Sequence, residues 1–320
     1  MIRCLLFCLS LAACQVAPAR ICDSRPDVVD PCGGPDGGEG PISGTPDPGS
    51  VPSGRVDANG GAVDRLWFAT TGDTRPAECD QTNLYPKAAI AGIAAAMRAL
   101  RVQFTVDLGD HMYVCNQSEA EARQQMSFYM EAVAQGPPAW WMTMGNHECG
   151  SDAYPFACFV NGAHDANFAA FMAALRRPRP WYANDVQTSQ GLARFVVVAD
   201  DSWNKEQASW LESTLADADT RARYTIIARH HPVDGMQAGS AEIVSALKRH
   251  KHSLILTAHE HDYRRDTGAW QGRSVVVGLG GAAGKWGFGT ILQAQDGALV
   301  FVRRDANGNP VGAPWKVGPQ

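Results

Sequence analysis

The sequence predicts an α/β fold for most of the chain, and both composition and residue order point to it. Hydrophobic residues make up 45% of the 320 residues and charged residues 19%, which excludes a wholly disordered chain. From residue 64 onward, short apolar runs alternate with longer segments of helical periodicity. Strands that alternate with helices are typical of buried sheets joined by crossover helices.

The predicted strands are short runs rich in Val, Ile, Phe and Trp, whereas the predicted helices are longer and repeat with a helical period. Strands are expected at residues 66–70, 102–108, 139–144, 193–199, 224–228, 254–258, 274–279 and 298–302. Helices are expected at residues 85–100, 118–134, 166–175, 206–216 and 241–251. No internal repeat or second boundary interrupts the pattern, so residues 64–320 are predicted to form one domain.

The charge balance argues against a nucleic-acid-binding protein. The formal net charge is −5, from 28 Lys and Arg against 33 Asp and Glu. Proteins that bind nucleic acid usually carry a basic stripe, so no specific nucleic acid is expected as a partner. No protein partner is evident either.

Residues 1–13 have the features of a secretory signal peptide. The apolar run from Cys4 to Ala13 follows Arg3 and is too short to span a bilayer, which takes about 20 residues. Leu11-Ala12-Ala13-Cys14 resembles the lipobox of bacterial lipoproteins, in which the cysteine becomes the lipidated N-terminus. The alternative is a plain signal peptide cut after Ala17-Pro18-Ala19. Because Gln15 and not Asp follows the cysteine, we expect an exported protein, anchored in the cell envelope at the outer membrane by a lipid on Cys14.

Residues 14–63 are predicted to form a disordered tether. Ten Gly and six Pro fall within residues 31–62, and large apolar side chains are almost absent from residues 23–62. Such a segment buries too little surface to offset the entropy lost on ordering, so no secondary structure is expected in it.

Polar residues follow five of the predicted strands. They form the segments Gly72-Asp73-Thr74-Arg75, Asp107 to Tyr113, Gly145-Asn146-His147-Glu148, Arg229-His230-His231-Pro232 and Ala258-His259-Glu260-His261. Loops at the carboxyl ends of strands in an α/β sheet converge on one rim. A lone Asp there is usually a turn or cap residue, and a lone His is usually a surface or core residue. Five segments together supply carboxylate, amide and imidazole ligands, which suit two first-row transition metals.

These segments resemble the motifs of the calcineurin-like metallophosphoesterases, which run D-x-H, G-D-x-x, G-N-H-D/E, H and G-H-x-H. The segment from Glu206 to Leu211 is also similar to the structural Q-x-x-W-L helix of that family. The resemblance implies an α/β/β/α sandwich in which helices flank two packed mixed sheets. Ala258 stands where the family usually has glycine, a small change unless the residue needs a positive φ.

A second departure from the family pattern concerns the first motif. It reads Asp73-Thr74-Arg75, so the usual histidine is absent. Tyr113 stands three residues after Asp110, as in the purple acid phosphatase branch, and a phenolate oxygen suits Fe(III). The alternative is that Tyr113 packs in the core and Arg75 faces solvent.

The resemblance implies two metal ions that share Asp110 as a bridging ligand. The first ion, expected to be Fe(III), would be held by Asp73, Asp110, Tyr113 and His261. The second, expected to be Zn, Mn or Fe(II), would be held by Asp110, Asn146, His230 and His259. His230 is preferred to His231 because the family ligand stands two residues before the proline.

The resemblance also implies the hydrolysis of a small phosphorylated substrate by a metal-bound hydroxide. Asp110 and His147 would be catalytic, and Asn146, His147 and Arg75 would contact the phosphate. The expected activity is that of an acid phosphatase-like phosphomonoesterase. A phosphodiesterase or nucleotide phosphatase of the same superfamily is the alternative, and a catalytically inactive surface binding lipoprotein is another.

Three sequence features bear on these alternatives. The chain has no G-x-S-x-G motif, which argues against a serine hydrolase. The glycine-rich segment from Gly278 to Gly284 lacks the Lys-Ser/Thr of a P-loop and is interpreted as a tight turn near the metals. The cluster Arg176-Arg177-Pro178-Arg179 beside Trp181 could contact a nucleotide, but a solvated helix end is the preferred interpretation.

Six cysteines remain once Cys4, Cys8 and Cys14 are assigned to the signal peptide and lipid site. An even number in an exported chain suggests disulfides, and metal binding is not indicated because no C-x-x-C is present. The working hypothesis pairs short neighbouring loops, as Cys22–Cys32, Cys79–Cys115 and Cys149–Cys158. Free buried thiols are the alternative.

Overall fold

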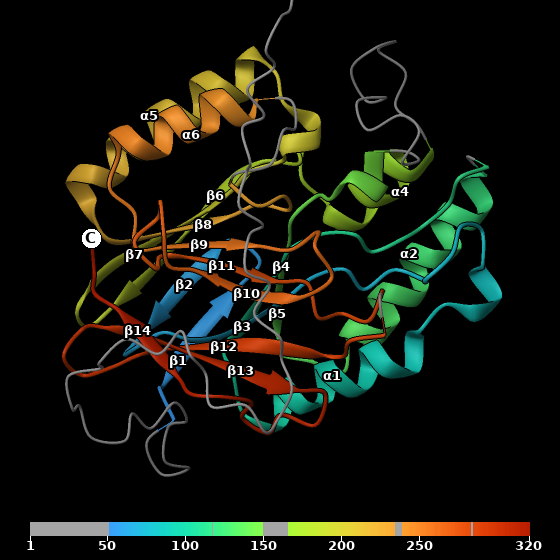
Figure 1. Cartoon of the computed structure of the whole chain (residues 1–320), viewed down its shortest axis with the longest axis horizontal. Coiled ribbons are helices and arrows are strands. Elements are labelled where there is room, and N and C mark those ends of the chain that lie inside the picture. The colour runs from blue at the N-terminus through green and yellow to red at the C-terminus, as the bar shows by residue number, and fades with distance from the viewer. Residues whose placement is uncertain (1–50, 117, 150–165, 234–238, 283) are drawn as a thin grey trace, which may run out of the picture. The chain divides into compact units, whose positions relative to one another are not determined.

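Two mixed β-sheets stack face to face, and helices cover the outer side of each sheet (Figure 1). The computed structural model describes residues 51–116, 118–149, 166–233, 239–282 and 284–320. All of them belong to one structural unit, Ile42–Gln320. The predicted α/β/β/α sandwich is confirmed.

The first sheet has six strands and carries the amino-terminal part of the site. Its spatial order is β14 (Trp315–Val317), β13 (Leu299–Asp305), β12 (Gly287–Gln293), β3 (Trp67–Thr71), β4 (Phe104–Asp107) and β5 (Ala139–Met142). The last three strands are parallel, whereas β12 is antiparallel to β3. The loops that follow β3, β4 and β5 therefore leave the sheet at the same end.

The second sheet has eight strands. Its spatial order is β1 (Gly54–Asp57), β2 (Gly60–Val63), β6 (Tyr182–Thr188), β7 (Gly191–Val197), β8 (Ala222–Ala228), β9 (Leu254–Thr257), β11 (Ser274–Val277) and β10 (Tyr263–Asp266). Strands β7, β8, β9 and β11 are parallel, so the loops after β8 and β9 also share one end.

The helices divide between the two outer faces. On the outer face of the eight-stranded sheet, α5 (Lys205–Arg221) and α6 (Ser240–Arg249) pack through Leu211, Leu215 and Ile243. On the other side, α1 (Lys87–Ala99) covers the six-stranded sheet and packs along α2 (Glu119–Val133), which in turn packs on α4 (Ala166–Leu175). Three short 3₁₀ turns, η2 (Thr82–Leu84), η3 (Asn146–Cys149) and η4 (Asp200–Ser202), complete the described helical structure.

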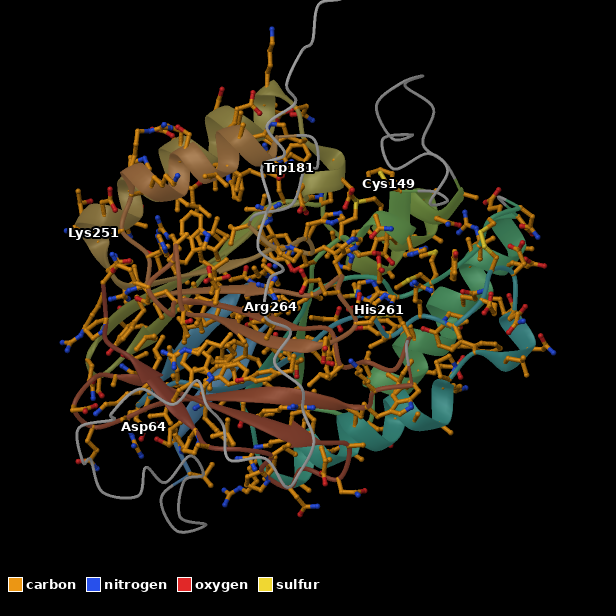
Figure 2. The ribbon with its side chains drawn as sticks, in the orientation of Figure 1. Asp64, Cys149, Trp181, Lys251, His261 and Arg264 are labelled. Carbon is orange, nitrogen blue, oxygen red and sulfur yellow. A yellow bond between two sulfur atoms is a disulfide. The ribbon has the colours of Figure 1, made fainter. Side chains whose placement is uncertain are left out.

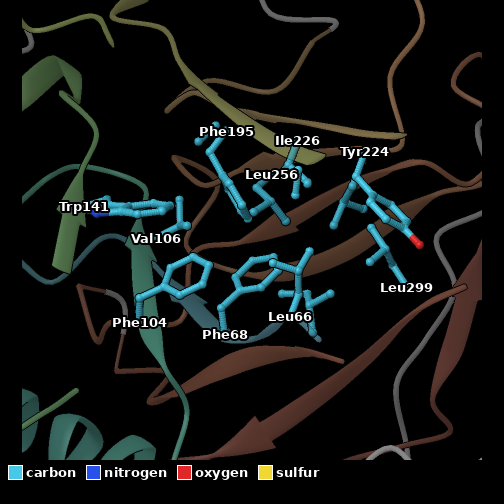
Figure 3. Packing of buried hydrophobic residues seen from close by; sticks show 14 of the residues in the cluster. Leu66, Phe68, Phe104, Val106, Trp141, Phe195, Tyr224, Ile226, Leu256 and Leu299 are labelled. Carbon is cyan, nitrogen blue, oxygen red and sulfur yellow. The ribbon is translucent and has the colours of Figure 1, made fainter. Parts of the chain in front are cut away.

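The main hydrophobic core lies between the sheets (Figure 3). The rings of Phe68 and Phe104 stack with centroids 5.1 Å apart. Phe195 of the opposite sheet meets them edge-on, at 5.1 Å and 5.3 Å. Because these rings are buried in tight contact, they fix the two sheets, and hence the loops at their ends, against each other.

All eight predicted strands and all five predicted helices are present, with α5 continuing to Arg221, beyond the predicted end at residue 216. Strands β1, β2, β6, β10, β12 and β14 lie outside the predicted set. The tether prediction was wrong over its last ten residues, because β1 and β2 form a hairpin whose β2 pairs with β6. Val56 and Val63 are buried there, and the turn-forming pair Asn59-Gly60 was the signal for the hairpin.

One predicted disulfide is confirmed: Cys79–Cys115 links the loop after β3 to the loop after β4. The Cys22–Cys32 pair, and Cys158 of the third pair, lie outside the described residues. The signal peptide, Cys14 and most of the tether lie outside them as well. Within the described residues, no helix combines the length and apolar character needed to cross a bilayer.

Candidate metal centre

The polar segments predicted from the sequence meet at one rim of the sandwich. Asp73, Asp110 and Asn146 follow the parallel strands β3, β4 and β5. His230 follows β8, and the segment with His259 and His261 follows β9. Their side chains come into contact across the two sheets, as the distances below show.

Three donor atoms converge at the predicted second metal site. Asn146 Oδ1 lies 3.0 Å from His230 Nε2 and 3.0 Å from His259 Nδ1. The two ring nitrogens are 3.3 Å apart. Asp110 Oδ1 lies 3.3 Å from His230 Nε2, so all four predicted ligands of this site are brought together.

The tautomer of His230 indicates what this cluster can bind. His230 Nδ1 lies 2.7 Å from the carbonyl oxygen of Leu108, to which it donates. In the neutral ring, Nε2 then carries a lone pair that faces Asn146 Oδ1 and Asp110 Oδ1, and both of these atoms are acceptors. Burial lowers the pKa of His230, but Asp110 outweighs it and raises the pKa well above its usual value, so a proton on Nε2 satisfies these acceptors when no metal is bound. A metal ion between the three atoms would take the place of that proton, so the donor set of the second site fits a metal ion.

Asp110 faces both predicted sites. Its Oδ1 accepts the backbone N–H of His147 at 3.1 Å and faces His230. Its Oδ2 lies 3.5 Å from Arg75 Nε and 3.7 Å from His147 Nε2. With one carboxylate oxygen toward each site, Asp110 would be placed to serve as a ligand shared by two ions.

The predicted first metal site has a different composition. Asp73, Asp110 and His261 offer ligand atoms within 4.8 Å of one another. Asp73 Oδ2 is buried and has no hydrogen-bond partner among the described residues. The guanidinium of Arg75 also lies in this cluster, with one amino group 3.4 Å from His261 Nε2 (His261 is labelled in Figure 2). These oxygen and nitrogen atoms suit a cation, but the Arg75 guanidinium already places a positive charge among them.

Tyr113, the fourth predicted ligand of the first site, is half-buried at its edge. Its ring lies 4.3 Å from the Arg75 guanidinium carbon and meets the His147 ring edge-on at 4.2 Å. The alternative, with Tyr113 packed in the core and Arg75 facing solvent, does not hold, because Arg75 is buried and Tyr113 is only half-buried. The role of Tyr113 as a ligand stays a prediction.

Burial dominates the electrostatics of these groups. It raises the pKa of Asp73 to about 7, an effect that His230 opposes and Asp110 reinforces. Burial also acts on Asp110, but His230, His147 and Arg75 outweigh it and hold the pKa of that carboxyl well below its usual value. Burial lowers the pKa of His259 to about 3. A dication among these groups would offset the cost of burying two carboxylates side by side.

The backbone is strained at the ligands. Eight non-glycine residues among those described have a positive φ, and four of them are predicted ligands: Asp73 (61°), Asp110 (60°), His259 (70°) and His261 (51°). This conformation costs a non-glycine residue on the order of 1 kcal/mol or more, so neighbouring contacts must hold it. Asp73 is held by its N–H bond to the Gly109 carbonyl at 3.0 Å. Ala258 is absent from the positive-φ set, which explains why alanine is tolerated there.

Two glycines leave room for the carboxylates. A Cβ on Gly278 would lie 2.2 Å from Asp73 Oδ2, and a Cβ on Gly145 would lie 2.3 Å from Asp110 Oδ1. The glycine-rich segment also binds the first loop through backbone hydrogen bonds, from Gly280 to Gly72 and from Ala282 to Asp73. This placement agrees with a tight turn next to the predicted metal ligands.

A buried network of charged side chains holds the loop that carries Asp110. His111 lies between Asp107 and Glu148, at 2.7 Å and 3.2 Å. Burial lowers the pKa of His111, but these two carboxylates outweigh it and raise the pKa to about 10, so the ring is charged. Glu148 also accepts the N–H groups of Asp110 and Gly145, at 3.0 Å and 2.6 Å. Both acids stood in the sequence segments but were not assigned this supporting role.

A second buried network lies behind His230. Arg229 donates to Asp200 Oδ2 at 2.9 Å, and His231 Nε2 lies 2.8 Å from Asp201 Oδ2. His231 also joins His230 and His259 in a cluster of ring nitrogens within 4.8 Å. Because Asp201 holds His231 while His230 faces Asn146, the geometry favours His230 as the ligand. Asp200 and Asp201 were missed from the sequence, although they directly follow a predicted strand.

Comparison with known proteins agrees with this geometry. Residues 68–263, more than half of the chain, match the calcineurin-like phosphoesterase family. The chain belongs to this family. Calcineurin-like phosphoesterases are hydrolases of phosphoric esters with a dinuclear metal centre, and this chain presents two groups of possible metal ligands. No curated protein matches the chain.

Solved structures show the same fold. Purple acid phosphatase PPD1 from seeds of yellow lupin (Lupinus luteus) is 17% identical, with a TM-score of 0.59 over 79% of this chain and 53% of that chain. The chain thus spans about half the length of the lupin protein. A dimetal phosphatase from Danio rerio is 16% identical, with a TM-score of 0.53 over 80% of this chain and 99% of that one. GAP50, the anchor in the inner membrane complex of Plasmodium, is 14% identical, with a TM-score of 0.54 over 80% of this chain and 89% of that chain.

Proposed function

We propose that this phosphoesterase is an acid phosphatase-like phosphomonoesterase with a metal centre at the described rim. The observation that carries the proposal is the convergence of three donor atoms that lie within 3.3 Å of one another: Asn146 Oδ1, His230 Nε2 and His259 Nδ1. Asp110 would be shared with a first site formed by Asp73, Tyr113 and His261. Fe(III) is proposed at the Tyr113 side and Zn, Mn or Fe(II) at the other.

The ions, when bound, would supply a water of lowered pKa and positive charge for the phosphate oxygens. The protein positions the remaining groups. His147 lies beside Asp110, with its ring held against Tyr113, where it can donate to a phosphate or to the leaving group. The Asn146 amide oxygen faces the second-site histidines. The Arg75 guanidinium lies beside the Asp110 carboxylate. An anionic substrate would meet positive groups on both sides of Asp110.

A nucleotide or diester substrate is the second candidate. The basic cluster at residues 176–179 does not favour it, because two of its three arginines have partners within the chain. Arg177 lies over the Tyr182 ring at 3.8 Å and donates to Asn184, and Arg179 pairs with Glu206 at 2.8 Å. These contacts support the interpretation as a structural helix end.

Paired assays of two chromogenic substrates test the proposal. The full chain, loaded with iron and zinc or with manganese, is expected to hydrolyse p-nitrophenyl phosphate with a kcat/KM at least about 10-fold above that for its bis ester. Asp110→Asn removes a shared ligand and should lower kcat on the order of 10³-fold. Glu119→Gln, an equivalent charge loss on exposed α2, should leave kcat unchanged.

Other outcomes would contradict the proposal. A preference for the bis ester would favour the phosphodiesterase. A folded chain that takes up metal but cleaves neither ester would favour the binding lipoprotein, for which the Plasmodium anchor protein offers a precedent in fold alone.

A further inference from the structure

Arg75 occupies the position of a cation in the first metal site. It replaces the histidine of the D-x-H motif, and its side chain is only 9% exposed. Its Nε lies 3.5 Å from Asp110 Oδ2, and an amino group lies 3.4 Å from His261 Nε2. The guanidinium carbon lies 4.3 Å from the centre of the Tyr113 ring. Three of the four predicted ligands of the first site therefore contact this one side chain.

These contacts compete with metal coordination. Arg75 has only donor groups, so His261 Nε2 must accept, and a neutral imidazole has a single lone pair for this purpose. The same lone pair cannot bind a metal while it accepts from Arg75. Asp110 Oδ2 likewise faces the guanidinium, on the side of the predicted first site.

The positive charge of Arg75 also disfavours a metal ion in the first site. A guanidinium is always protonated, and like charges a few ångströms apart in a buried site repel strongly. The second site has no comparable neighbour. Among the described residues, Asn146, His230 and His259 contact one another and His230 also contacts Asp110, so the partners found for these three side chains include no Lys or Arg. The two sites are thus unequal before any ion binds.

We propose that Arg75 and the first-site metal are alternative occupants, so the protein binds one ion tightly at the second site and a further ion only after Arg75 withdraws. The proposal rests on the metal centre of the proposed function but not on ester cleavage. With one ion bound, the Arg75 guanidinium supplies the positive charge on the other side of Asp110. A phosphate would then lie between a metal and an arginine.

Metal stoichiometry tests the proposal without a substrate. Mn(II) or Zn(II) is titrated into the metal-free full chain, and binding is followed by calorimetry and by metal analysis after dialysis. The wild-type protein should bind the first ion roughly 100-fold or more tightly than the second. At one equivalent, Mn(II) should give the paramagnetic resonance spectrum of an isolated ion. Two ions of similar affinity, or a coupled Mn(II) pair at one equivalent, would overturn the proposal.

Variants of Arg75 give the complementary test. Arg75→Gln removes the charge, and Arg75→His restores the family motif. Both should bring the two affinities within about 10-fold and produce a coupled Mn(II) pair at two equivalents. Arg123→Gln, which removes a surface charge paired with Glu119, should bind metal as the wild type does. Circular dichroism establishes that each variant is folded, and an unchanged ratio of the two metal affinities in both folded Arg75 variants would refute the competition. Loss of phosphatase activity alone would affect only the proposed function.

Discussion

Single residues make space for the metal ligands as well as supplying them. Gly145 lies against the carboxylate of Asp110, where a Cβ would be 2.3 Å from Oδ1. Gly145→Ala should displace this shared ligand and weaken metal affinity about 10-fold or more. Gly92→Ala is the matched control, because a Cβ at Gly92 meets nothing within 4 Å. Calorimetric metal titration of both variants checks the prediction, and equal affinities would contradict it.

Tyr113 is the residue whose role differs most between the two interpretations of the sequence. If it binds Fe(III), the oxidised protein with both sites filled by iron should show a visible phenolate charge-transfer band. Tyr113→Phe should abolish the band, whereas Tyr182→Phe, which alters a buried tyrosine that donates to Met142, should retain it. The measurement is an absorption spectrum at two equivalents of iron. A colourless wild-type protein would show that Tyr113 packs beside the site without binding the ion.

At the scale of elements, the helix α5 joins the site to the outer layer. Gln207 of α5 is buried and holds the end of β7, accepting from the Ala199 N–H and donating to the Ala199 and Ser202 carbonyls. Leu211, one turn later, packs in the core beneath α6. The Q-x-x-W-L segment is therefore structural, as the sequence indicated, and it positions the turn that carries Asp200 and Asp201.

The contact between α5 and α6 should be sensitive to pH. Burial lowers the pKa of His250, but hydrogen bonds to Asp219 and Glu212 outweigh it and raise the pKa. Glu212 also pairs with Arg249. A raised pKa in the folded state means that the stabilising contribution is complete below about pH 6.5, the ordinary pKa, and is lost as pH rises through the folded-state pKa. His250→Gln should therefore reduce the free energy of unfolding more at pH 5.5 than at pH 9.

His252 provides a control of opposite sign. Burial lowers its pKa, so its neutral form is favoured in the folded state and its contribution is lost as pH falls. Chemical denaturation of His250→Gln and His252→Gln at the two pH values should give destabilisations that change in opposite directions. A pH-independent effect of His250→Gln would show that its ion pairs contribute nothing to stability.

At the scale of the whole molecule, the two-layer sheet explains how distant segments form one centre. Parallel β3, β4 and β5 release their loops at one end, and parallel β8 and β9 do the same in the other sheet. The aromatic core between the sheets sets the distance between those two groups of loops (Figure 3). A core mutation could thus alter metal affinity without touching a ligand.

We propose that the domain is exported and attached to the outer membrane by a lipid on Cys14, on the basis of the lipobox-like sequence alone. Cys14→Ser should move the full chain from the membrane fraction to the soluble fraction of the cell envelope. Fractionation with Cys8→Ser as control measures this, since that residue would leave with the signal peptide. A chain with Cys14→Ser that stays in the membrane fraction would contradict the lipid anchor.

The missed strands show where sequence patterns are weak. In β6, the buried residues Tyr182, Asn184, Val186 and Thr188 alternate with more exposed ones, but half of the buried set is polar. In β12, glycines at 287 and 289 suggest a turn, yet every residue of the strand is buried. Polar and glycine residues enter these strands because partner strands on both sides satisfy their backbone groups. That partnership is not visible in a local run of residues.

Local patterns were sufficient for the elements that bury apolar side chains, for the order of the motifs and for the chemistry of the ligands. Strand-end positions and residue types are properties of neighbouring residues along the chain, so a single sequence can show them. The motif already favoured His230 over His231, and the contacts of the two rings agree with that preference. The supporting acids at 107, 148, 200 and 201, and the placement of Arg75 inside the predicted first site, required the folded structure. These features depend on which side chains meet across two sheets, and rotamers and burial in a packed core are set by all the surrounding elements at once.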